Sequence, residues 1–176
     1  IHPPPNRADA RSSRGMGRVI SIASQKGGVG KTTTAINLGA CLAQESKRVL
    51  VVDIDPQGNA TSGFGINGND QRHSTYEVLI GQADAQQAIM PTALATLDLM
   101  PAGQRLSGAE VELVGMMARE TRLKTCLAKV RDEYDYVFID SPPALGLLTI
   151  NSLTASDSVL IPLQCEYLAL EGLTQL

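Results

Sequence analysis

The chain has 176 residues, of which 43% are hydrophobic and only 3% aromatic, and it carries a formal net charge of −3. This composition excludes a disordered chain, and the weakly acidic balance gives no reason from charge alone to expect nucleic-acid binding. Every apolar run is far shorter than the about 18 residues that a membrane-spanning helix needs. The N-terminus lacks the apolar region of a secretory signal. We therefore expect a cytoplasmic protein without a transmembrane segment.

The first 17 residues, IHPPPNRADARSSRGMG, hold three prolines, three arginines and almost nothing apolar. We interpret residues 1–17 as a disordered N-terminal lead, with an arginine arm that contacts phosphates as the alternative. Met16 is a candidate for the natural start of the protein. The folded domain is expected over residues 18–176.

Short apolar runs then alternate with helical patterns along the chain. Strands are predicted at 18–24, 48–54 and 97–102, in YDYVFID ending at Asp140, and in DSVLIPLQ at 157–164. Helices are predicted at 32–43, at 74–81 with Ser74 and Glu77 as a capping box, and at 84–90, 108–130, 145–156 and 167–176. The polar residues 56–73 are expected to form a long loop.

This alternation predicts an α/β fold in which helices cover both faces of a parallel β-sheet. Ligands of such sheets bind at the carboxyl ends of the strands, where loops 25–31, 54–59 and 140–144 all fall. The chain stops at Leu176, one turn into an apolar helical pattern, so we expect the domain to be incomplete at its C-terminus.

The stretch IASQKGGVGKTTTAINLG, residues 22–39, predicts a phosphate-binding loop between a strand and a helix. Its glycines let backbone N–H groups converge on a phosphate, Lys31 would contact the β- and γ-phosphates, and the Thr32 hydroxyl would hold Mg²⁺. The usual pattern G-x-x-x-x-G-K-[ST] is matched only in part, because Gln25 stands where its first glycine is expected. The predicted nucleotide-binding residues are Lys26, Gly27, Gly28, Val29, Gly30, Lys31, Thr32 and Thr33.

The additional lysine of this loop, Lys26, carries a family resemblance. KGGVGKTT resembles the deviant Walker A motif of the ParA/MinD class of P-loop ATPases. The resemblance implies ATP and ADP as ligands, Mg²⁺ as cofactor, and a nucleotide sandwich homodimer that forms on ATP binding. In that dimer Lys26 would reach the phosphates of the partner, whereas Lys31 would act in its own protomer. A cation supplied from outside in this way neutralises charge that develops during phosphoryl transfer.

The resemblance extends from about Gly17 to Leu176 and includes EYLALEGL at residues 166–173, which it places near the dimer interface. In the family, the adenine contacts and much of the DNA-binding surface belong to the C-terminal third of the domain. The resemblance therefore implies that this third is missing from the present sequence.

Two carboxylates follow the second predicted strand, in VVDIDPQGN. The spacing of Asp53 and Asp55 puts both on one face of an extended strand, where they could order magnesium-bound water and orient an attacking water. A turn aspartate before Pro56 is the alternative. DxDPQGN resembles the ParA family, and this resemblance implies that Asp55 positions the hydrolytic water while Asp53 supports the metal shell.

A further carboxylate, Asp140, ends the apolar strand YVFID, as the magnesium-associated aspartate of a Walker B motif does. The following Ser-Pro-Pro resembles the second switch of the family, which senses the γ-phosphate. The predicted catalytic residues are Lys26, Lys31 and Asp55, and the predicted metal residues are Thr32, Asp53 and Asp140. The predicted switch residues are Asp55, Pro56, Gln57, Asp140, Ser141, Pro142 and Pro143.

The resemblance implies a nucleoid-associated ATPase that segregates plasmids or chromosomes. Its ATP dimer would bind DNA without sequence preference, and a ParB-like partner would stimulate hydrolysis. The alternative is a MinD-like, membrane-associated spatial regulator, and only the DPQGN continuation argues against it. A metal-cluster carrier or nitrogenase-like reductase would need paired cysteines, whereas Cys41, Cys126 and Cys165 are far apart without a CxxC or His–Cys pattern.

Overall fold

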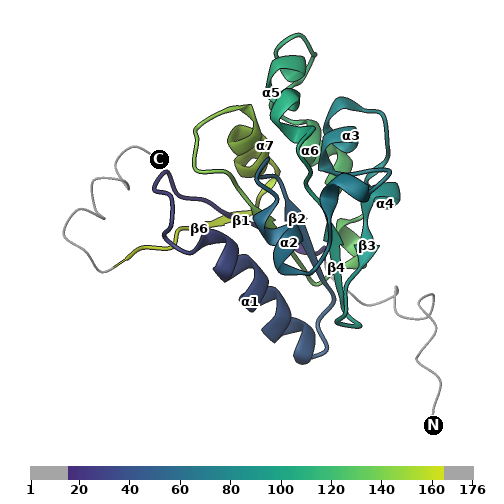
Figure 1. The fold of residues 1–176 in the computed structure, drawn as a ribbon. Coiled ribbons are helices and arrows are strands. Elements are labelled where there is room, and N and C mark those ends of the chain that lie inside the picture. The colour runs from purple at the N-terminus through teal and green to yellow at the C-terminus, as the bar shows by residue number, and fades with distance from the viewer. Residues whose placement is uncertain (1–15, 165–176) are drawn as a thin grey trace.

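The fold is built on one six-stranded sheet, seen in a computed structural model that describes residues 16–164 (Figure 1). The strand order is β3-β4-β2-β5-β1-β6, and all neighbours are parallel except β3, which runs antiparallel to β4. The predicted α/β fold with a parallel sheet is confirmed except for β3, whose antiparallel pairing was not predicted. The strands are β1 (Arg18–Ile22), β2 (Val49–Asp53), β3 (Met90–Pro91), β4 (Leu97–Met100), β5 (Tyr136–Asp140) and β6 (Ser158–Leu160).

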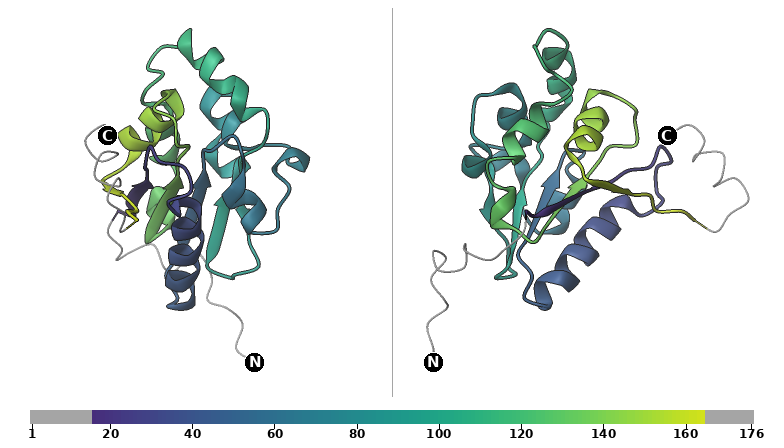
Figure 2. Two further views of the ribbon diagram at one scale, coloured as in Figure 1. Left: turned by 60° about the vertical axis from the view of Figure 1, so that its left-hand side comes forward. Right: turned by 180° about the vertical axis from the view of Figure 1, so that it is seen from behind.

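Helices cover both faces of this sheet, as Figures 1 and 2 show. The longest helix, α1, lies along one face, and most of the shorter helices pack on the other. The helices are α1 (Lys31–Gln44), α2 (Asn59–Gly63), α3 (Thr75–Ile80), α4 (Ala85–Ala88), α5 (Leu106–Val114), α6 (Arg122–Leu127) and α7 (Leu147–Ala155), with 3₁₀ turns at Gly68–Asp70 and Arg131–Glu133.

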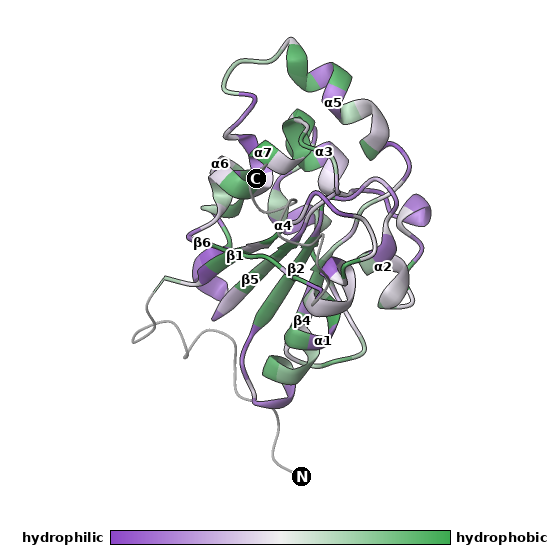
Figure 3. Ribbon diagram, turned by 90° about the vertical axis from the view of Figure 1, so that its left-hand side faces the viewer, coloured by the Kyte–Doolittle hydropathy of each residue, from purple (hydrophilic) through white to green (hydrophobic). Residues whose placement is uncertain are grey.

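The central strand β2 shows why its sequence is apolar throughout. Successive side chains of a strand point to opposite faces. Val49 and Val51 therefore pack in the cluster that contains α1, whereas Leu50 and Val52 pack in the cluster with α3, α5, α6 and α7. Both faces are covered, so all four side chains are fully buried. Figure 3 shows the central strands of this sheet mostly in green, the colour of hydrophobic residues.

Two predicted segments differ from the structure. The predicted loop 56–73 contains α2 and a 3₁₀ turn, and the predicted helix 108–130 is two helices, α5 and α6. The apolar spacing continues across the break because Leu113 and Leu123 are both fully buried in the same core. Between them, Ala118 has a φ of 52°, which ends helical geometry. Strand β3 was not predicted from the sequence, because it is only two residues long.

Other local predictions are confirmed. Ser74 and Glu77 form the expected capping box at the start of α3. The predicted helix 167–176, the segment EYLALEGL, Cys165 and residues 1–15 of the predicted lead lie outside the described residues. In the part of the chain that is described, no helix combines the length and the apolar character needed to cross a membrane.

Candidate functional site

The glycine loop joins the end of β1 to the start of α1, where it was predicted. Gly28 and Gly30 have φ values of 74° and 92°, a left-handed conformation that L-residues with a side chain disfavour. Gly30 is the N-cap residue of α1 and has no side chain to cap the first N–H groups of that helix. These N–H groups and the positive end of the helix dipole therefore remain available for an anion.

An open cavity of about 510 Å³ lies over this loop and joins it to the segments that follow β2 and β5. The structure thus brings together three loops that the sequence placed at the carboxyl ends of the strands. Asn59 contributes to the wall although it was not among the predicted site residues; the DPQGN motif ends on it. The lining residues are Gly27, Gly28, Gly30, Lys31, Thr32, Thr33, Asp55, Gln57, Asn59 and Pro143.

The two lysines of the loop differ in their surroundings. Lys31 begins α1, is only 7% exposed, and its Nζ donates to the backbone carbonyl of Lys26 at 3.4 Å. Lys26 is exposed to solvent, and its N–H donates to the Ser24 hydroxyl at 3.4 Å. Lys31 is therefore held against the cavity of its own chain, whereas the Lys26 side chain lies on the outer surface.

Asp140 ends β5 and is fully buried, and neither oxygen of its carboxylate has a hydrogen-bond partner of normal geometry among the described residues. Burial raises the pKa of Asp140 to about 7, with further contributions from Asp53 and Asp55, while the Thr32 hydroxyl and Lys31 oppose the rise. A buried carboxylate without donors is costly unless a cation or a proton compensates it.

The surroundings of Asp140 fit magnesium. Mg²⁺ prefers oxygen ligands, usually one or two protein oxygens completed by substrate phosphates and water. Asp140 and Thr32 offer such oxygens beside the predicted phosphate site. The described residues contain no group of three or more His, Cys, Asp or Glu side chains that could hold a metal by themselves. A magnesium ion here would therefore share its coordination with the nucleotide.

Asp53 ends the neighbouring strand β2 and is also fully buried, but its carboxylate is well supplied with donors. It accepts from the N–H and the hydroxyl of Thr61 at 2.8 and 2.7 Å and from the N–H of Asp55 at 3.1 Å. Burial raises the pKa of Asp53 to about 6, although the bonds from Thr61 and Asp55 oppose the rise.

Asp55 lies beyond the end of β2, on the wall of the cavity, and is 7% exposed. Its Oδ1 accepts from the N–H of Gln57 at 2.9 Å, and its carbonyl accepts from the N–H of Gly58 at 2.9 Å. The carboxylate is thus held in a tight turn that includes Pro56 and faces the phosphate loop. Gln57 is exposed on the same wall.

The predicted second switch follows Asp140. Pro143 is exposed on the cavity wall, whereas Ser141 and Pro142 are buried. The Ser141 hydroxyl lies 2.6 Å from that of Ser152 in α7, which in turn lies 2.7 Å from that of Ser21 in β1. All three hydroxyls are fully buried. The sequence did not reveal this cluster, because its members are 11 or more positions apart.

Comparison with known proteins agrees with this geometry. A family model described as an AAA domain matches residues 17–176. The chain is 61% identical over 161 residues to the sporulation initiation inhibitor protein Soj of Bacillus subtilis, covering 92% of this chain and 64% of that protein. It is 56% identical over 172 residues to the chromosome partitioning protein ParA of Myxococcus xanthus, covering 96% of this chain and 61% of that protein. The chain therefore spans less than two thirds of these relatives.

A solved structure with a similar fold is cobyrinic acid a,c-diamide synthase from Mycobacterium smegmatis, with a bound ATP analogue and magnesium. It has a TM-score of 0.86 and 45% sequence identity, over 90% of this chain and 65% of that one. A second structure of that protein holds ADP and magnesium. The expected cofactors, ATP, ADP and Mg²⁺, are thus those bound by structural neighbours. The glycine loop, the buried Lys31 and the matches over nearly all of the sequence lead to one conclusion: the chain belongs to the AAA domain family, as a homologue of Soj and ParA.

Proposed function

We propose that this chain is the nucleotide-binding part of an ATPase that partitions plasmids or chromosomes. The observation that carries the proposal is the convergence of Lys31, Thr32 and Asp55 on one cavity, with Lys26 exposed on the same loop. The glycine loop and Lys31 would be sufficient for a site that only binds phosphates. A carboxylate at the same cavity adds a group that can orient water for hydrolysis.

The chemistry follows from the position of each group. The loop N–H groups and Lys31 bind the β- and γ-phosphates, and Asp55 accepts a hydrogen bond from the water that attacks the γ-phosphorus. Bound magnesium would neutralise phosphate charge beside Thr32 and Asp140. Lys26 of a second protomer completes the charge compensation, so each site is incomplete until two ATP-bound chains associate. The exposed position of Lys26 supports this role.

The wider cycle is part of the proposal. The ATP dimer binds non-specific DNA on the nucleoid, and a ParB-like protein that binds the centromere stimulates hydrolysis and releases the dimer. The relatives named Soj and ParA support this cycle. The DNA-binding surface is expected mainly in the part of the relatives that this chain does not span.

The test uses the full-length gene product and its Asp55→Ala variant. Binding to random-sequence duplex DNA and to anionic liposomes is measured side by side, with ATP, with ADP and without nucleotide, at two salt concentrations. We expect the variant to accumulate as an ATP dimer, because water is no longer oriented. This dimer should bind DNA only with ATP, and binding should weaken at the higher salt because phosphate contacts release counterions.

Other outcomes would contradict the proposal. Liposome binding without DNA binding would favour the MinD-like alternative. An Asp55→Ala protein that stays monomeric with ATP would remove Asp55 from the hydrolytic role. ATP hydrolysis is measured in buffer without a carboxylic-acid acceptor, which separates simple hydrolysis from an amide-forming reaction of the kind named for the Mycobacterium smegmatis protein. Absence of hydrolysis under these conditions would contradict the ATPase proposal.

A further inference from the structure

Thr61 in α2 joins the ends of two strands through its side chain. Its hydroxyl donates to Oδ2 of Asp53, at the end of β2, at 2.7 Å, and accepts from the N–H of Ala102, after the end of β4, at 2.9 Å. The hydroxyl is buried and uses both its donor and an acceptor position. Valine has nearly the same shape but could make neither bond.

The same carboxylate caps the helix in which Thr61 lies. The N-cap position of α2 is Gly58, which has no side chain to cap the helix and a φ of 62°. Asp53 supplies the missing acceptor from outside the helix, because its Oδ2 accepts from the N–H of Thr61 at 2.8 Å. A carboxylate at this place bonds the free N–H and complements the helix dipole.

Asp55 is attached to the same carboxylate as Thr61. Oδ1 of Asp53 accepts from the N–H of Asp55 at 3.1 Å, while Oδ2 bonds Thr61. One buried carboxylate thus holds residues 55–61 at both ends, through Asp55 and Thr61. The position of the Asp55 side chain over the cavity depends on both attachments.

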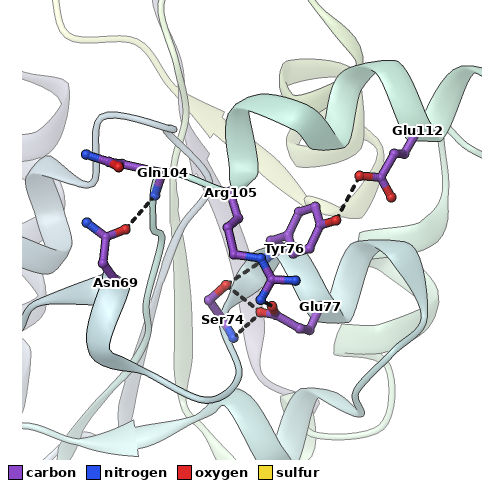
Figure 4. A network of polar contacts seen from close by, with 7 residues as sticks. All are labelled: Asn69, Ser74, Tyr76, Glu77, Gln104, Arg105 and Glu112. Carbon is purple, nitrogen blue, oxygen red and sulfur yellow. Dashed lines mark hydrogen bonds and ion pairs between the residues drawn. The ribbon is translucent and has the colours of Figure 1, made fainter.

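The segment after β4, which contains Ala102, is itself held in place by contacts with α3. The N–H of Thr75 donates to the carbonyl of Pro101 at 2.8 Å. Arg105 forms an ion pair with the buried Glu77 at 2.5 Å, and its guanidinium lies 4.6 Å from the centre of the Tyr76 ring. Figure 4 shows Arg105 between these two side chains of α3. Thr61 therefore ties the Asp55 loop to a part of the fold that is fixed by α3.

Resting on the proposed ATPase function, we propose that Thr61 is a positioning residue for hydrolysis. It holds Asp55 over the γ-phosphate through Asp53 and Ala102, and Asp53 serves this positioning rather than the magnesium shell. The neighbouring Asp140, whose oxygens have no donor of normal geometry within residues 16–164, would be the carboxylate on the magnesium side. Thr61 touches neither the nucleotide nor the attacking water, so its effect on the reaction is transmitted through Asp55.

The test compares Thr61→Val and Thr61→Ala, which lack the hydroxyl, with Thr61→Ser, which keeps it, in the full-length gene product. Thr96→Val is the matched control, because the Thr96 hydroxyl also donates one hydrogen bond, to the carbonyl of Ala43 at 2.9 Å, but lies remote from the cavity. The readouts are kcat for ATP, the Kd of a fluorescent ATP analogue, the magnesium concentration at half activity, and hydrogen exchange of peptides that cover residues 54–63.

We expect Thr61→Val to lower kcat by about tenfold or more, as loss of a hydrogen bond to a charged group suggests, with little change in Kd or magnesium dependence. Peptides over 54–63 should exchange faster without nucleotide, and Thr61→Ser should restore most of kcat. If the valine variant does not fold, Thr61→Ala is measured in its place, with the same expected result. The Thr96→Val control should match wild type in kcat and in exchange of 54–63.

Four results would overturn the inference. Three of them are a wild-type kcat in Thr61→Val and Thr61→Ala, a parallel loss of ATP affinity or magnesium affinity, and no recovery in Thr61→Ser. Hydrogen exchange does not require hydrolysis, so unchanged exchange of 54–63 would overturn it even for a protein without ATPase activity. Absence of hydrolysis in the wild-type protein would instead contradict the proposed function, and the two failures are therefore distinguishable.

Discussion

Asp53 and Asp140 are paired residues on the neighbouring parallel strands β2 and β5, yet their carboxylates have opposite surroundings. Asp53 accepts three hydrogen bonds from Asp55 and Thr61, whereas Asp140 accepts none of normal geometry among the described residues. Both are fully buried, and burial raises the pKa of each, to about 6 and about 7. Two carboxylates at equivalent strand ends thus differ in their partners: one accepts from backbone and hydroxyl donors, and the other, which lacks such donors, would suit a cation.

Removing the Asp140 charge should stabilise the nucleotide-free protein at high pH. Its pKa is raised from 3.8 to about 7 on folding. Between these values the folded state keeps a proton that the unfolded state has lost, so stability falls as pH rises through this window. At pH 8 we expect Asp140→Asn to raise Tm by about 3 °C or more, with a smaller difference near pH 4.

The exposed Asp132 supplies the control, Asp132→Asn, which should leave Tm unchanged at both pH values. The Tm of each variant is measured by thermal unfolding monitored with circular dichroism. A lower Tm for Asp140→Asn at pH 8 would show that the buried charge does not strain the folded state. In the presence of Mg-ATP we expect the variant to lose the additional stabilisation that wild type gains from the complex.

Lys31→Ala should abolish nucleotide binding in practice. Lys31 is 7% exposed at the start of α1, where its charge is little screened and faces the cavity. We expect the Kd of a fluorescent ATP analogue to rise by about 100-fold or more, in line with the loss of a buried charge-assisted hydrogen bond. The exposed Lys47, at the far end of α1, provides the control Lys47→Ala. A wild-type Kd for the ATP analogue in Lys31→Ala would contradict the assignment of residues 26–33 as a phosphate-binding loop.

Lys26→Ala should bind ATP but neither dimerise nor hydrolyse it. Lys26 is exposed on the loop, and the proposal assigns it to the partner's phosphates. Mixing this variant with Asp55→Ala, which is expected to bind ATP and to dimerise, gives a sharper test. In a mixed dimer, the Lys26→Ala protomer has its own Lys31 and Asp55 and receives Lys26 from its partner, so one site is complete.

We therefore expect the mixture to recover part of the wild-type hydrolysis rate, although each variant alone is inactive. A steady-state phosphate-release assay at constant total protein measures this recovery. Wild-type turnover of Lys26→Ala alone, or no recovery on mixing, would refute action across the dimer.

The buried hydroxyl cluster predicts a stability effect at a distance from the cavity. Ser152 bonds both Ser21 and Ser141, whereas the latter two are 3.2 Å apart. Ser152→Ala should lower the free energy of unfolding by about 1–2 kcal/mol, because two buried hydroxyls lose their shortest bond. Urea unfolding measures the change, with Ser107→Ala at an exposed position as control. An unchanged free energy of unfolding would mean that the three hydroxyls are interchangeable with apolar groups.

Much of the fold and the outline of the site could be predicted from local sequence. The glycine loop, the capping box at Ser74 and the apolar strands depend on near neighbours in the chain, and each was found where expected. Lys31 and Asp55 could be assigned to one site because parallel strands end at the same edge of a sheet.

The features that were missed depend on contacts between distant residues. Helix α2 follows Gly58, and the acceptor for its first turn comes from Asp53 on β2, so no local capping signal marks it. Thr61 looked like an ordinary loop residue because its bond to Ala102 joins positions 41 residues apart. The separate helices α5 and α6 looked continuous because both bury leucines on one core.

The antiparallel β3 at the edge of the sheet limits how copies of this protein can aggregate. Its two residues cover β4, and the exposed Pro91 has no N–H to offer to another chain. A foreign strand that approached this border would find neither the length nor the donors needed to extend the sheet. Growth of the sheet by addition of a strand from another copy is therefore disfavoured on the β3 side.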